Sequence, residues 1–257
     1  MNFISLLEVE LKKIRRSGIF IILFAAAVFM WIPAIFHGDV NFKTQADIGI
    51  APEYNFLIQG FMGLAWFMFP ACMVVCTVLI CQTERGNHGM LKMLSLPIKT
   101  GKLCLAKFAV LLALGACFLF FAAVVYFISA GIVSKTQSYD FMLSPIFVLK
   151  ETGLIFLTSI PMVAFFWLLS VCIRTPIFAM GVGFASIVPS VLMINTKFWF
   201  VYPMAYPFFA VTNEYAKLAE SMTPKRIDDV LWGSIALFVT LICVFVSCFC
   251  FGQGERR

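Results

Sequence analysis

The chain has few side chains whose type and spacing could support catalysis or bind a metal. Cys72 and Cys76 stand four residues apart, so they share a helix face and could bind a soft metal, but no Cys-x-x-Cys pair or nearby His completes such a site. We interpret them as small packing residues. The two histidines, His37 and His88, are far apart, and neither His-Glu-x-x-His nor Gly-x-Ser-x-Gly occurs. We therefore expect no catalytic residue, no metal ligand and no cofactor in this chain.

The apolar segments also lack the acidic side chains that usually couple transport to protons or sodium. Glu151 and the pair Asp228-Asp229 stand at segment edges, where we expect water to reach them. A Gly-x-x-x-x-Gly-Lys-Ser/Thr phosphate loop is absent as well. If the chain moves a solute, its energy should come from another protein; a secondary transporter or channel is the weaker alternative.

One segment is suited to contact such a protein. Gly86 and Gly89 interrupt the helical pattern, a Met-rich apolar stripe follows on a short helix, and Pro97 ends that helix. Met side chains adapt to a groove on a partner, although the stripe could also pack beneath helices of its own chain. The candidate ATPase-coupling residues are Glu84, Arg85, Gly86, Asn87, His88, Gly89, Met90, Leu91, Lys92, Met93 and Leu94.

A second segment, 198–213, is rich in aromatic residues and is interrupted by Pro203 and Pro207. Such a density of aromatic side chains is typical of a membrane interface. The segment could form a simple interfacial belt, or it could be re-entrant where protein shields its broken backbone. The candidate residues for contact with a substrate or the outer leaflet are Phe198, Trp199, Phe200, Tyr202, Tyr206, Phe208 and Phe209.

The elements that position these segments are predicted to be membrane-spanning helices. Of the 257 residues, 62% are apolar and 12% are charged, compared with about half and about a quarter in soluble domains. Runs of about 20 residues without charge predict transmembrane helices. Six such runs predict an all-α integral membrane fold in a single permease domain, 1–257, with spans near 18–37, 58–81, 106–131, 149–173, 176–195 and 229–251.

The distribution of charge predicts the orientation of the chain. Twelve of the 19 Lys and Arg residues fall on the side that holds both termini, and most of the acids fall on the other side. The positive-inside rule therefore places both termini in the cytoplasm. Before the first span, Phe3, Leu7, Leu11 and Ile14 recur at helical spacing, which predicts an interfacial helix, or alternatively a solvated positive flank.

This layout resembles the permease subunits of type-2 ABC transporters. Two features of the layout carry the resemblance: a surface helix before the first of six spans, and a Pro- and aromatic-rich stretch between spans 5 and 6. The third feature is the segment that begins at Glu84, in which an acidic residue and a Gly-containing helix are followed by Leu96-Pro97-Ile98 and Lys102. The short outer loops look most like bacterial permeases for lantibiotic or bacitracin immunity and resistance. One departure is Met90, which stands where many relatives have an aromatic residue.

The resemblance implies an ATP-driven exporter. Two permease chains, commonly non-identical, would pair in a bacterial cytoplasmic membrane, and two separate ATP-binding subunits would hold the ATP and Mg²⁺. Residues Glu84 to Leu94 would seat in the ATPase, and an amphiphilic peptide would be lifted from the outer leaflet. An exporter for another drug or a lipid-like substrate, or a membrane sensor or scaffold that transports nothing, is the alternative.

Overall fold

The computed structural model describes residues 3–15, 17–85, 99–225 and 229–251, and within these residues the chain forms helices and connecting turns without strands. Six of the described helices are long and apolar enough to cross a membrane, which confirms the predicted six-span, all-α fold. The candidate spans are Ile19–Phe36, Pro52–Gln82, Thr100–Gln137, Pro145–Cys172, Pro176–Met193 and Val230–Cys250.

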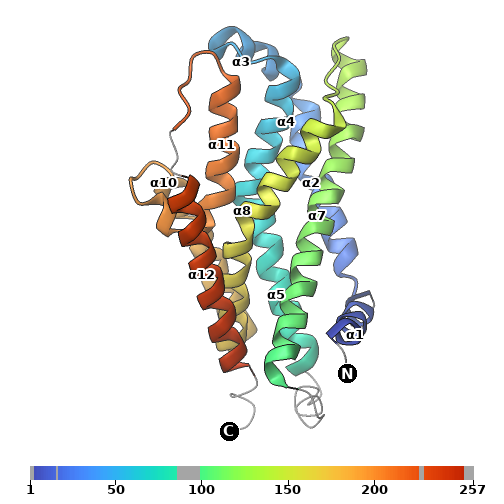
Figure 1. Ribbon diagram of the computed structural model, residues 1–257. Coiled ribbons are helices and arrows are strands. Elements are labelled where there is room, and N and C mark those ends of the chain that lie inside the picture. The colour runs from blue at the N-terminus through green and yellow to red at the C-terminus, as the bar shows by residue number, and fades with distance from the viewer. Residues whose placement is uncertain (1–2, 16, 86–98, 226–228, 252–257) are drawn as a thin grey trace.

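The helices form a bundle whose two ends differ (Figure 1). The first helix, α1, and the last turn of α12 lie at the same end, which we call the terminal end, and α3 lies at the opposite end, the far end. The helices are α1 (Phe3–Arg15), α2 (Ile19–Phe36), α3 (Val40–Ile48), α4 (Pro52–Gly63), α5 (Phe69–Arg85), α7 (Thr100–Gln137), α8 (Pro145–Cys172), α9 (Pro176–Ile187), α10 (Ser190–Met193), α11 (Tyr206–Leu218) and α12 (Asp229–Cys250).

Two of the spans are longer than their charge-free runs. The third span begins at Thr100, seven residues before Lys107, and the fourth begins at Pro145, six residues before Glu151. Both charged side chains are buried inside the protein, so the helices continue through them without exposing charge to lipid. The charge-free runs therefore located the spans but underestimated the length of these two helices.

A sharp corner separates α1 from α2. Gly18 adopts φ +73°, a left-handed conformation that glycine reaches without steric cost, and α1 therefore lies across the direction of the long helices (Figure 1). On α1, Leu6 and Ile14 are buried against the protein, whereas Phe3 and Leu11 are exposed. The exposed apolar side chains are suited to a membrane surface, as predicted for an interfacial helix.

Large aromatic residues fill the core between α2, α4 and α7. Trp31 is fully buried, and its Nε1 donates a hydrogen bond to the carbonyl of Ala122 at 3.1 Å. Its ring lies 5.5 Å from Phe56 and 5.4 Å from Tyr126, between ring centroids. A Cβ on Gly60 would stand 2.6 Å from the Trp31 ring, so a glycine is required for α4 to approach α2 this closely.

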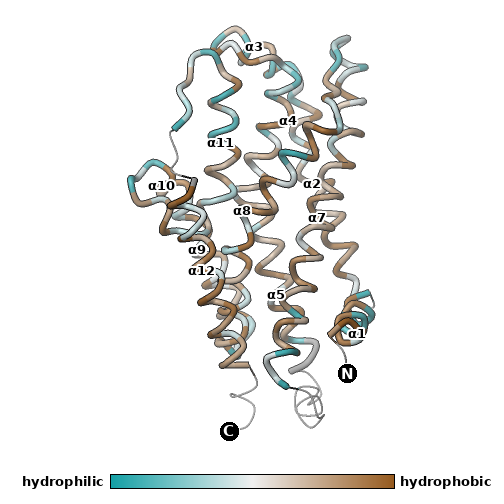
Figure 2. The backbone as a smooth tube through the Cα atoms, in the orientation of Figure 1, coloured by the Kyte–Doolittle hydropathy of each residue, from teal (hydrophilic) through white to brown (hydrophobic). Residues whose placement is uncertain are grey.

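The predicted aromatic segment folds into short turns followed by a helix. Two 3₁₀ turns, Trp199–Val201 and Pro203–Ala205, precede α11, and Pro203 and Pro207 stand at the starts of helical turns, where proline is tolerated. From there α11 runs toward α3, away from the terminal end (Figure 1), and Ser221 just beyond it donates to the carbonyl of Ile48. In Figure 2 the far-end part of α11 and α3 are the more hydrophilic regions, whereas the long helices are hydrophobic.

Candidate functional site

The predicted coupling segment begins in the last turn of α5 and precedes α7 in the sequence, and α5 ends and α7 begins at the terminal end (Figure 1). Glu84 and Arg85 are the last two residues of α5. The other nine predicted residues, Gly86 to Leu94, lie outside the described residues. The contact of this segment with an ATPase therefore stays a prediction, but the two helices that would receive its motion are described.

A buried ion pair fastens α1 to α7 at this end. The Nζ of Lys107 lies 2.5 Å from one carboxylate oxygen of Glu10, and the Nζ of Lys13 lies 2.7 Å from the other. Lys107 is 1% exposed and Glu10 is 3% exposed, so the pair is removed from water. Lys107 stands two helical turns after Thr100, where α7 begins.

The charges around Glu10 keep it ionised. Burial acts to raise the pKa of its carboxyl group, but the Lys107 ammonium and then Lys13 act in the opposite sense, and the net pKa lies below its ordinary value. Because a buried charge that loses its partner is strongly destabilising, Glu10 and Lys107 each depend on the other. The pair therefore links the interfacial helix mechanically to the span that follows the coupling segment.

The seven predicted aromatic residues divide between surface and interior. Phe198 is 67% exposed, whereas Tyr206 and Phe209 are buried. Trp199 stacks on Phe209, with centroids 3.6 Å apart and planes at 9°, and also contacts Trp232 of α12. The remaining three, which lie between these extremes, are Phe200, Tyr202 and Phe208. Much of the segment therefore packs the start of α11 against α9 and α12, and its contact with substrate stays a prediction.

Hydrogen bonds and ring contacts hold this aromatic cluster in place. The hydroxyl of Tyr202 donates to the carbonyl of Ser186 on α9, and the hydroxyl of Tyr206 donates to the carbonyl of Phe200. The Nε1 of Trp232 is buried without a hydrogen-bond partner in the part of the chain that the structure describes. Phe208 lies against Trp66, 6.3 Å between ring centroids, so the cluster also reaches the helix formed by α4 and α5.

The expectation that water reaches Glu151 is wrong, since this side chain is 1% exposed. Its helix, α8, is covered here by α11, which the sequence did not place. The Nζ of Lys150 lies 3.5 Å from Glu151 Oε1 and 3.6 Å from Glu214 Oε2. One exposed lysine therefore stands between two carboxylates where α8 and α11 pack together.

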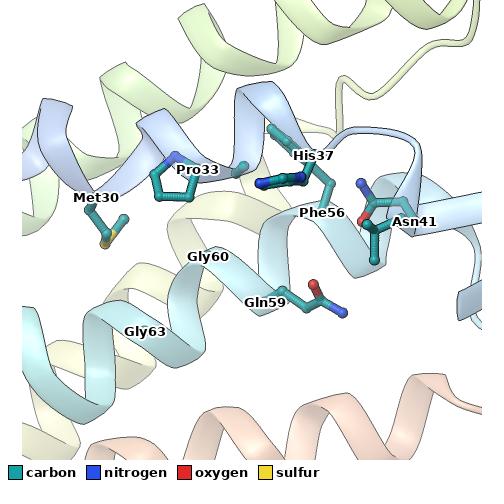
Figure 3. Close-up of a pocket in the computed structure, with 10 residues that line it drawn as sticks. Met30, Pro33, His37, Asn41, Phe56, Gln59, Gly60 and Gly63 are labelled. Carbon is teal, nitrogen blue, oxygen red and sulfur yellow. The ribbon is translucent and has the colours of Figure 1, made fainter.

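A pocket of about 270 Å³ opens between α2, α3 and α4 near the far end. Met30 and Gly63 lie toward one side of it, and His37, Asn41 and Gln59 lie toward the other (Figure 3). The residues that line the pocket are Met30, Pro33, Ala34, His37, Val40, Asn41, Phe56, Gln59, Gly60 and Gly63. The pocket thus has an apolar part and a polar part.

Neutral amide groups organise the polar part. Asn55, which is fully buried, donates from Nδ2 to Asn41 Oδ1 at 2.7 Å. Its own Oδ1 accepts from Gln59 Nε2 at 3.0 Å and from the hydroxyl of Tyr215 at 3.2 Å. These hydrogen bonds connect α3, α4 and α11 around a single side chain, and they hold Asn41 and Gln59 at the pocket.

Neither the ion pair nor the pocket was predicted from the sequence. An amide pair at i and i+4, Asn55 and Gln59, within an otherwise apolar run was the available signal for the pocket, because amides inside a membrane helix usually bond to a neighbouring helix. Glu10, one of two acidic residues among the basic residues before the first span, was the signal for the ion pair. Among the described residues, no three His, Cys, Asp or Glu side chains come together in a way that could hold a metal ion.

A comparison with protein-family models relates residues 6–190, well over half of the chain, to the family described as ABC-2 family transporter protein. The matched region begins in α1 and ends in α10, so it includes the first four spans, most of the fifth, the predicted coupling segment, both partners of the buried ion pair and the whole lining of the pocket. No curated protein and no solved structure matches the chain.

Proposed function

The chain belongs to the ABC-2 family of transporter proteins, and from this premise we propose that it is the permease of an exporter that removes lantibiotic- or bacitracin-type peptides from a bacterial membrane. Membership of the family makes it a multi-pass transport component that works with an ABC ATP-binding subunit. The exported substrate, the cell membrane of a bacterium and cytoplasmic termini are parts of the proposal.

The observation that carries the energy-coupling part is the ion pair of Glu10 and Lys107. The predicted coupling segment leaves α5 after Arg85, and the chain enters α7 at Thr100. A push on that segment reaches α7 directly, and α7 carries α1 with it because two buried, opposite charges resist separation. The parts of α1, α5 and α7 at the terminal end would therefore move together.

In the proposed mechanism the partner subunits bind ATP and Mg²⁺, and their closure displaces the segment Glu84 to Leu94. The displacement tilts α5 and α7, which run from the terminal end into the bundle (Figure 1). A second permease chain, which we propose to be a non-identical paralogue, completes the transport path. Between α10 and α11, the exposed ring of Phe198 is suited to meet an amphiphilic peptide in the outer leaflet.

The coupling assignment is tested with Met90→Asp plus Leu94→Asp, which adds two charges to the apolar stripe. We expect the variant to insert in the membrane, to lose co-purification of the ATP-binding subunit, and to lose protection of cells against the peptide. The matched control, Met142→Asp plus Met222→Asp, changes two exposed methionines near the far end and should retain the subunit. An active ATPase that co-purifies with the first variant would overturn the coupling assignment.

The proposed substrate is tested separately, by the concentration of peptide that stops growth. Cells that express the chain with its ATPase should need a higher concentration of lantibiotic or bacitracin to stop growth, and a variant ATPase that cannot hydrolyse ATP should remove that protection. Unchanged sensitivity to these peptides, with the ATPase still bound, would contradict the substrate while leaving the permease role intact.

A further inference from the structure

Both walls of the pocket between α2 and α4 are built from irregular helix. Pro33 lies inside α2 and supplies no N–H, so the helical hydrogen bond to the carbonyl of Phe29 is missing. On the other wall, α4 passes at Gly63 into a π-helical turn, Leu64–Met68. Such turns cost stability and are frequent at functional sites. Two neighbouring interruptions that open one space indicate a pocket that serves a purpose.

Gly63 keeps the apolar part of this pocket open. A Cβ built at Gly63 meets no atom within 4 Å, and Gly63 lines the pocket. Gly60, one turn earlier, is required by the close approach of Trp31, but no such contact explains Gly63. The empty volume beside Gly63 is therefore available to a bound molecule.

The lining of the pocket changes from apolar to polar along the direction of the membrane-spanning helices, toward the far end. Met30 and Pro33 belong to the apolar length of α2, which ends at Phe36, and His37 is the next residue. On the facing helix, Gly63 lies within the apolar part, and Gln59 lies one turn closer to the far end (Figure 3). A molecule with an apolar chain in the bilayer and a polar group at its surface would match this order.

Among the described residues that line the pocket none is Asp, Glu, Lys or Arg, and their polar groups are two amides and an imidazole. Gln59 and His37 are exposed at the pocket, whereas Asn41 is buried and held by Asn55. A charged head group would lose water here without gaining an opposite charge, which is unfavourable. Amide and hydroxyl groups can instead exchange hydrogen bonds with Gln59 and Asn41.

We propose that this pocket binds the neutral, amide- or hydroxyl-bearing head group of a single-chain amphiphile, together with the first methylenes of its chain. The volume of 270 Å³ is near the lower limit of small-molecule pockets, so the rest of the chain lies outside it, along the bundle. Binding does not depend on the proposed function; the role of the bound amphiphile as an export substrate rests on it.

The experiment uses the full chain in nanodiscs and a photo-crosslinking probe, an N-dodecanoyl dipeptide amide with a diazirine near its head group. Mass spectrometry locates the crosslinks, and empty nanodiscs and unlabelled competitors define specific labelling. We expect crosslinks on α2 and α4 near Met30 and Gly63, which excess N-dodecanoyl dipeptide amide or monododecanoylglycerol prevents. Dodecanoate, which carries a charged head group, should compete about tenfold less well, a difference of about 1.4 kcal/mol.

Substitutions at two matched glycines separate pocket binding from partition into lipid. Gly63→Leu fills the pocket and should lower specific labelling at least tenfold, and Gly63→Ala should lower it less. Gly233→Leu is the control, because a Cβ at Gly233 also meets nothing within 4 Å but lies on α12, away from the pocket. Thermal melting of each variant shows that the fold is retained.

Three results would overturn the assignment: equal labelling of the Gly63→Leu and Gly233→Leu variants, crosslinks spread over the lipid-facing helices, or equal competition by dodecanoate. The two neutral competitors also distinguish the possible sources of the bound amphiphile, since the dipeptide amide represents acylated peptides and the monoacylglycerol represents lipids. A failure to bind would leave the retention of the ATPase by the coupling segment untouched, so the two proposals fail separately.

Discussion

The two ends of the bundle use different chemistry to bury polar side chains. At the terminal end, Glu10 and Lys107 form a charged pair between α1 and α7. At the far end, Asn55 joins three helices through neutral hydrogen bonds. A buried charge pair strongly opposes separation, whereas each amide hydrogen bond contributes only about 1 kcal/mol and can be exchanged. The terminal end is therefore suited to transmit force, and the far end is suited to accept and release a ligand.

The largest effect is expected from Lys107→Met, which leaves the Glu10 carboxylate buried with Lys13 as its remaining cation among the described residues. Removal of one partner of a buried pair should lower stability by about 3 kcal/mol. A thermal melt of the purified chain in detergent measures the loss. A melt indistinguishable from that of the unchanged protein would show that the terminal end does not depend on this pair.

The pH dependence of stability provides a second test of the Lys107→Met variant. The pKa of Glu10 in the folded protein is below its ordinary value. The ionised carboxylate therefore contributes to the stability of the fold at pH values above its pKa in the unfolded chain, and this contribution is lost as the pH falls through its pKa in the folded protein. Lys107→Met should raise the pKa of Glu10 and shift that loss to higher pH. The double variant Glu10→Met plus Lys107→Met should regain stability but should transmit less ATPase activity into transport.

At the far end, Asn55→Leu should cost less, about 2 kcal/mol, because it leaves Asn41 and Tyr215 without a shared partner but strands no charge. The same thermal melt compares it directly with Lys107→Met. Asn195→Leu, at an exposed asparagine, is the matched control and should change little. A larger loss from Asn55→Leu than from Lys107→Met would reverse the proposed contrast between the ends.

The spans could be predicted because transfer of apolar segments into lipid depends on local composition, and each run of about 20 residues carries that signal by itself. Glu10 and Lys107 are 97 residues apart, and their contact depends on the corner at Gly18 and the path of α7. Without that path, the sequence shows Lys107 only as a basic residue near the start of the third predicted span, 106–131. Glu151 was misplaced for the same reason, since its cover comes from α11.

The pocket was hidden for a different physical reason. The empty space lies beside Gly63, which has no Cβ, and Pro33 lines the same pocket from α2, which Trp31 packs against α4. Local sequence shows the glycine and the proline but not that they face each other. The aromatic segment was recognised by composition, whereas the burial of Tyr206 and Phe209 depends on packing against α8 and α12.

The smallest effect is expected from Lys12→Ala, which removes a pair with the same chemistry on the same helix. The Nζ of Lys12 lies 2.8 Å from Glu8, but the two side chains are 72% and 64% exposed. Water and salt screen such a pair, and its formation costs side-chain freedom, so the thermal melt and the coupled ATPase activity should both stay within experimental error. The contrary result is that Lys12→Ala lowers the melting temperature as much as we expect for Lys107→Met. In that case any ion pair on α1 would stabilise the chain equally. The burial of the pair against α7 would then not distinguish the terminal end from the far end.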